Sequence, residues 1–150
     1  MIRSIAAGAA FALAAGAFAA SAAPAAAPPT AGEAIRLEMR IEARTAPIQD
    51  RAQFEAYVAA NPSPRANPFR LLSADAQRRF VASLDFDAIR RGTAVPQAAD
   101  IEAELTLSQA WRLLALVGQQ WEVVMMPDIR VETDDDRLVD DWRKLFERVE

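Results

Sequence analysis

Apolar residues concentrate most strongly between Leu105 and Met126, the longest apolar segment outside the N-terminus. Within it, apolar side chains recur every three or four residues, and further large ones widen this stripe to most of the circumference. The first set is Leu107, Ala110, Leu114 and Val117, and the second is Trp111, Leu113 and Leu116. A helix that is apolar on most sides has to be covered by others. We therefore expect this segment to form the buried centre of a helical domain.

Polar residues and glycine set the limits of this central helix. Thr106 and Gln109 fit a capping box, in which a hydroxyl and an amide three residues apart satisfy free backbone N–H groups. Gly118 predicts an interruption, either as a C-cap or as a point of close packing. Residues 119–126 then continue as a second helical piece that ends at Pro127. Its glutamines, with Arg112 and Glu122 in the same apolar segment, argue against a membrane span.

Four other stretches have helical periodicity and recognisable starts. Asp50 with Gln53 opens 50–60, and Ser73 opens 73–84. Residues 100–105 fit one or two short turns that lead into the central helix. A C-terminal helix follows the acidic run 134–136, because acidic residues favour the positive end of a helix. Its apolar side chains recur at helical spacing and are Leu138, Trp142, Leu145, Phe146 and Val149.

Glu33–Ala46 fits two structures. Ile35, Leu37 and Met39 alternate with charged residues, which is the period of a strand. The same stretch is rich in strong helix formers and poor in β-branched residues. We favour a helix, because no neighbouring segment offers a convincing partner strand.

The remaining segments act as connectors. Prolines hold 61–72 extended, with Phe69, Leu71 and Leu72 expected to pin the loop to the core. We predict that 85–99 is irregular, with Phe86 and Ile89 as core residues. Together these patterns predict an all-α fold. We expect a single-domain helical bundle of about four to six helices with irregular connectors, spanning residues 33–150.

The N-terminus has the pattern of a signal peptide. Arg3 precedes the uncharged apolar run 5–20, and small residues suitable for cleavage follow within 17–22. We assign 1–22 to a signal peptide for the general secretion route and 23–32, rich in alanine and proline, to a flexible tether. An uncleaved anchor helix is the alternative. The prediction is a periplasmic or secreted protein that meets the membrane only transiently, through its signal peptide.

Composition narrows the chemistry. The chain contains no cysteine and no histidine, which excludes disulfides, thiolate nucleophiles, Cys/His zinc sites and imidazole catalysis. The formal net charge is −4, and a mildly acidic chain is a poor candidate for binding nucleic acid, whose affinity depends on a basic surface. No cluster of glycines fits a phosphate-binding loop. We predict no cofactor and no nucleic-acid partner.

Acidic residues concentrate near the C-terminal helix, from Glu132 to Asp141. Carboxylate clusters bind calcium, so a calcium-responsive protein that uses Asp134–Asp141 is one alternative function. Helix capping and dipole compensation account for the same pattern, and we favour that interpretation. A second calcium motif, which would start at Asp85, fails because Ile89, Arg90 and Pro96 stand where the loop needs an oxygen ligand, glycine and an acid.

We predict a protein-binding module, such as an adaptor, an inhibitor or an envelope-homeostasis factor, whose partner is another envelope protein. Binding is favoured over catalysis, and no catalytic, cofactor or metal residue is selected. The first alternative is a carboxylate-based envelope hydrolase, which needs two converging acids. The side chains expected to be exposed for partner binding are Arg78, Arg79, Trp111, Arg112, Trp121 and Met126.

Overall fold

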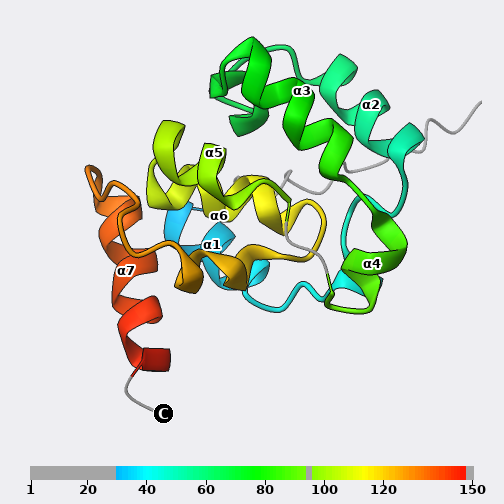
Figure 1. Cartoon of the computed structure of the whole chain (residues 1–150). Helices are drawn as coiled ribbons and strands as arrows, with labels where there is room; N and C mark the ends of the chain where they lie inside the picture. The colour runs from blue at the N-terminus through cyan, green and yellow to red at the C-terminus, as the bar shows by residue number, and fades with distance from the viewer. Residues whose placement is uncertain (1–29, 94–95, 148–150) are drawn as a thin grey trace, which may run out of the picture.

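The computed structural model describes residues 30–93 and 96–147. The predicted signal peptide and residues 23–29 of the predicted tether lie outside these residues, as does Val149, whereas tether residues 30–32 cap and begin the first helix. The described chain forms seven α-helices and three short 3-10 helices (Figure 1). Their bounds are α1 (Ala31–Glu38), η1 (Ala43–Thr45), α2 (Arg51–Ala60), η2 (Pro68–Leu71), α3 (Ala74–Ser83), α4 (Phe86–Arg90), α5 (Ala98–Glu104), α6 (Leu107–Ala115), η3 (Gln120–Met125) and α7 (Asp134–Glu147).

These elements confirm the prediction of an all-α protein. Within the described ranges, the only strand-type pairing is an isolated bridge between Thr106 and Arg130. The helices outnumber the predicted four to six, partly because 86–90, expected to be irregular, forms α4. Asp85 starts that helix by accepting a hydrogen bond from the Ala88 N–H at 2.9 Å. No helix in the described part of the chain is long and apolar enough to cross a bilayer.

The α6 helix is the centre of the molecule, as its apolar pattern predicts. Figure 1 shows it between α5 and α1, with α7 along one side. Leu107, Leu113 and Leu114 are fully buried in one core that extends from α1 to α7. Burying a leucine side chain stabilises a fold by about 1.5–3 kcal/mol. The predicted capping box is present: Gln109 Oε1 accepts from the Thr106 N–H at 3.0 Å, although the Thr106 hydroxyl makes only a loose return contact.

Gly118 ends this helical region and serves both predicted purposes. Its φ of 74° lies in the left-handed region, where glycine is favoured over other residues. The next N–H, of Gln119, closes the helix end on the Leu114 carbonyl at 2.9 Å. A Cβ at position 118 would lie 2.5 Å from the Ala43 backbone. Only glycine therefore lets η1 pack directly against the end of α6.

Two segments differ in detail from the predictions. The helical preference for 33–46 holds for α1, but the helix ends at Glu38 and a turn leads into η1. Residues 120–125 form a 3-10 helix, whose three-residue turn changes which side chains face inward. As a result Met126, which was expected to be exposed, is buried, whereas Met125 is 75% exposed.

Candidate functional site

Two contacts fix the orientation of α3 on the rest of the fold. At its start, the Ser73 N–H and hydroxyl both donate to the Glu104 carboxylate of α5, at 2.5 and 2.8 Å. Nearly two turns later, Arg79 donates two hydrogen bonds to Asp100 at 2.7 and 2.8 Å. The hydrogen bond from Arg79 lowers the pKa of Asp100 below its ordinary value. These contacts turn one side of α3 toward α5 and leave Arg78 on another side.

Three aromatic rings join α3 to α2. Phe54, Phe69 and Phe80 are buried, with ring centroids 5.1–5.8 Å apart, and the Phe54–Phe69 pair is edge-to-face. Such pairs are worth about 0.5–1.5 kcal/mol beyond the area that they bury. A hydrogen bond also joins the start of α2 to the end of α3, because Arg51 Nη2 donates to the Val81 carbonyl at 2.9 Å. The two helices and the η2 segment therefore form a firmly held unit.

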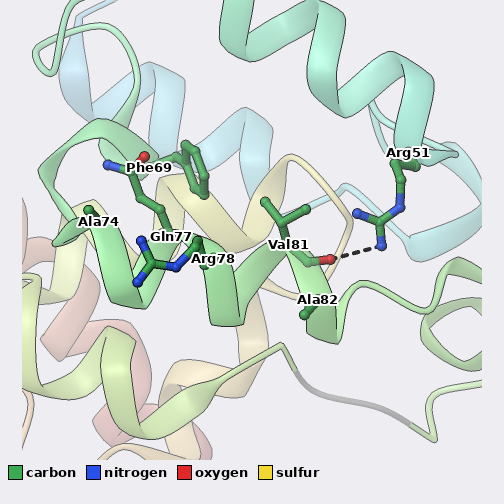
Figure 2. Close-up of a pocket in the computed structure, with 7 residues that line it drawn as sticks. All are labelled: Arg51, Phe69, Ala74, Gln77, Arg78, Val81 and Ala82. Atoms are coloured by element: carbon green, nitrogen blue, oxygen red, sulfur yellow. Dashed lines mark hydrogen bonds between the residues drawn. The ribbon is translucent and has the colours of Figure 1, made fainter.

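A groove opens on this unit, and we call it the α3 groove. Its volume is about 710 Å³, and it is lined by Arg51, Phe69, Ala74, Gln77, Arg78, Val81 and Ala82. Figure 2 shows that most of these side chains follow one face of α3, with Arg51 reaching over from α2. The lining contains small apolar side chains and the buried ring of Phe69. The groove is shallow and open to solvent, which suits a partner surface better than an enclosed small molecule.

Cations border the α3 groove near both ends. Arg51 lies by the C-terminal end of α3, and its one hydrogen bond to Val81 uses one of five N–H donors. Arg78, with 72% of its side chain exposed, pairs with Asp75 one turn earlier on the same helix. Exposed pairs of this kind are worth little and exchange readily for other partners. No carboxylate belongs to the lining, so the groove favours a negatively charged partner.

The six predicted partner-binding residues do not come together. Arg78 lines the α3 groove, whereas its neighbour Arg79 is turned toward Asp100. Trp111 is 1% exposed and Met126 is fully buried, so the expectation that they lie on the surface is wrong. The reason is the breadth of the apolar stripe on α6, which is enclosed on nearly all sides.

The other two predicted residues lie between core and surface. Trp121 is half-buried and packs edge-to-face on Trp111, with centroids 5.0 Å apart. Arg112 is also half-buried and pairs with Asp135 of α7 at 2.9 Å. A partner-binding role for these residues stays a prediction.

Arg112 also borders a second hollow, of about 440 Å³. It lies between the 64–71 loop and the first turns of α6 and α7, and its polar lining includes Ser108, Gln109 and Thr133. The ion pair with Asp135 is made inside this hollow. Asp135 therefore already neutralises the charge of Arg112, and this second hollow is a weaker candidate for a binding site than the α3 groove.

The acidic cluster at the start of α7 is used within the fold. Asp136 is fully buried and accepts hydrogen bonds from the N–H groups of Ser108 at 2.7 Å, Glu132 at 3.0 Å and Thr133 at 2.8 Å. Burial raises the pKa of Asp136, but hydrogen bonds from Ser108, Glu132 and Thr133 outweigh it and hold the pKa far below its ordinary value. Asp140 likewise pairs with Arg143 at 2.6 Å and Lys144 at 2.5 Å.

These engagements favour capping and dipole compensation as the purpose of the acidic cluster. In residues 30–93 and 96–147, no group of three or more acidic side chains is placed to hold a metal ion. Asp136 occupies the positive ends of both α6 and α7, so it acts as the anion that those helix ends attract. A calcium-responsive role for Asp134–Asp141 would require breaking these contacts.

One buried acid was not selected from the sequence. Glu38 is half-buried, and its Oε2 atom and Nε1 of nearby Trp111 are both enclosed without a hydrogen bond of ordinary geometry. Burial raises the pKa of Glu38, against the opposing field of Arg112 and the contact with Trp111. The groups that act on this carboxyl include no second acid. Glu38 alone does not supply the acid pair that a carboxylate-based hydrolase needs.

Comparison of the chain with protein-family models, with curated proteins and with solved structures finds no match. The candidate site therefore has to be judged on its own geometry. Sequence reasoning selected Arg78 but missed Arg51, Phe69 and Val81. The missed signal is the spacing of Ala74, Arg78 and Ala82, which places small residues and a cation on one face of α3.

Proposed function

We propose that this protein is a binding module for another protein and that the α3 groove is its docking surface. The observation that carries the proposal is an open groove with a small-residue apolar lining and a cation near each end. An apolar patch with a polar rim is the usual form of a site for protein association. The groove lies on a unit braced by three aromatic rings and by the contacts of α3 with α5, so it is available without rearrangement.

We also propose that the module acts outside the cytoplasm, with another envelope protein as its partner. The support is the pattern of residues 1–22, in which Arg3 precedes an uncharged apolar run and small residues. Cell fractionation with intact-mass measurement tests this proposal. A soluble envelope fraction that lacks about the first twenty residues agrees with it, and a full-length cytoplasmic chain contradicts it.

The docking surface is tested by two matched substitutions. Ala82→Glu places a charged side chain in the α3 groove, and Ala103→Glu makes the same change on the exposed side of α5. Both residues are exposed alanines inside helices, so the effects on folding should be small and alike. The wild type and both variants are used to capture proteins from the envelope fraction, and captured proteins are quantified by mass spectrometry.

The proposal expects a protein that the wild type and Ala103→Glu retain equally and that Ala82→Glu loses. Equal retention by all three chains would place the contact elsewhere. Retention of nothing specific by any of them would remove the docking function. Melting curves of each variant show that a loss of capture is not a loss of folding.

A further inference from the structure

The charges of the molecule are unevenly divided between two regions. From Asp50 to Arg91, which includes α2, α3 and α4, seven arginines stand against five acidic residues. From residue 96 to residue 147, which includes α5, α6 and α7, five basic residues stand against twelve acidic ones. In Figure 1, α2 and α3 lie at one end of the molecule and α7 lies at the far side of α6. Of these two regions, the α3 groove therefore lies in the one with a net positive charge.

Resting on the docking function proposed above, we infer that the occupant of the α3 groove is an amphipathic helix of another protein, with acidic residues near both ends of its apolar face. The acidic character follows from Arg51 and Arg78, the two charged residues of the lining, which lie near opposite ends. Each presents N–H donors that a carboxylate accepts in a charge-assisted hydrogen bond.

The helical form of the occupant follows from the groove itself. Its lining runs along α3 from Ala74 to Ala82, nine residues that rise about 12 Å, or a little over two helical turns. Apolar anchors at positions i, i+4 and i+7 of a partner helix match this length. Side chains of one helix pack into the groove between two others in the ordinary manner of helical proteins. A peptide that binds by strand addition would need a sheet edge, and the described ranges contain no strand that offers one.

Charge also separates this occupant from its rivals. A second copy of this chain could bring the acidic residues of α7, but Asp135 is held by Arg112, and Asp140 by Arg143 and Lys144, of the same chain. Asp75, which pairs with Arg78, is not part of the groove lining, and this exposed pair is displaced at little cost. A short partner helix covers less than the ~800 Å² per partner of a standard interface, so we expect binding in the micromolar range.

Two synthetic helical peptides test the inference. Both are about twelve residues long with leucines at positions i, i+4 and i+7. One carries glutamates near both ends, and the other carries lysines at the same positions. Each is titrated into isotope-labelled protein, purified as the cell processes it, while backbone amide signals are followed by NMR.

Arg78→Glu and Arg91→Glu form the matched pair of variants. Both reverse one arginine of the same region, but Arg91 is exposed after α4 and outside the groove lining. We expect the glutamate peptide to shift the amide signals of Phe69, Gln77, Val81 and Ala82 in the wild type. Arg78→Glu should weaken the binding of the glutamate peptide about tenfold, because Arg78 lines the groove and would contact a peptide carboxylate directly. Arg91→Glu should weaken it far less, because solvent and salt screen a charge outside the lining. The lysine peptide should bind Arg78→Glu better than it binds the wild type.

The inference is overturned if the two peptides bind the wild type equally, if the shifted signals lie elsewhere, or if the two arginine variants weaken binding alike. It is also overturned if the protein self-associates and the same groove signals shift with its own concentration, because the occupant is then a second copy. The Ala82 and Ala103 pair tests the docking function separately. If a partner is lost only in Ala82→Glu but the protein shows no preference for the glutamate peptide, the docking function is supported and the inference of an acidic helix is contradicted.

Discussion

The first turn of α7 and the outer face of α3 both carry clustered charge, but the fold uses them in different ways. At α7, Asp136 accepts three backbone N–H groups and Asp135 pairs with Arg112, so the charges hold elements together. At α3, Arg78 has only an exposed pair with Asp75 and lies beside an apolar groove. The density of charge is greater at α7, yet the better candidate for binding is α3. A site is indicated by charge that the fold leaves available next to apolar surface.

The strongest way to break this comparison is to remove Asp136. We expect Asp136→Ala to lower the free energy of unfolding by about 3 kcal/mol or more, because three N–H donors lose a buried acceptor. Asp134→Ala, in the same first turn but with a 96% exposed side chain, should change it by less than about 0.5 kcal/mol. Urea denaturation measures both. Equal effects would mean that the cluster is not a structural junction.

The pH dependence of Asp136 follows from the direction of its pKa shift. Its pKa in the folded state lies below its unfolded value, so its contribution to stability is present above the unfolded pKa, about 3.9. That contribution is lost as pH falls from there through the folded pKa. We therefore expect acid unfolding of the wild type to be steeper than that of Asp136→Asn. Parallel curves from pH 7 to pH 2 would show that Asp136 is not the group responsible.

Glu38 sharpens the comparison because its pKa shift has the opposite sign. The folded-state pKa is raised, so its contribution to stability is present below the unfolded pKa and is lost as pH rises through the folded value. Glu38→Gln should therefore gain stability relative to the wild type as pH rises, because the amide cannot ionise in this partly buried position. Melting temperatures at pH 4 and pH 7 measure the change. A variant that gains no stability relative to the wild type between these pH values contradicts this interpretation of Glu38.

The smallest expected effect separates two neighbouring arginines. Arg79→Ala removes two hydrogen bonds to Asp100 and should lower the melting temperature slightly. Arg78→Ala removes only an exposed pair with Asp75 and should leave the melting temperature unchanged within error. Differential scanning calorimetry measures both. A larger decrease in melting temperature for Arg78→Ala than for Arg79→Ala would show that Arg78 stabilises the fold and is not available to a partner.

Local signals carried most of the helical prediction. Ser73, Asp50 and Thr106 cap helices where the sequence places them, because capping depends on residues three positions apart. The breadth of the apolar stripe on α6 also predicted its burial. It should have excluded Trp111 as a surface residue, since that same stripe includes it. Met126 was predicted to be exposed but is buried, because a 3-10 helix turns its side chains differently from an α-helix.

The candidate site was predicted only in part because it depends on contacts between distant segments. Arg78 and Arg79 are chemically equivalent in the sequence, and only the position of α5 decides that Arg79 meets Asp100. Phe69 reaches the groove because η2 packs against α2 and α3 through Phe54 and Phe80. Glu38 is half-buried because α1 lies against α6. No periodicity along one segment contains that information.

The most direct test of the docking surface is site-specific photo-crosslinking in the living cell. A photoreactive amino acid is introduced at Ala82 in the α3 groove and, as the matched control, at Ala103 on α5. The docking function predicts a discrete crosslinked product at position 82 that position 103 does not give. It also predicts that Arg78→Glu in the same chain weakens that product. No product at position 82, or the same product at both positions, would contradict the assignment of the α3 groove as the docking surface.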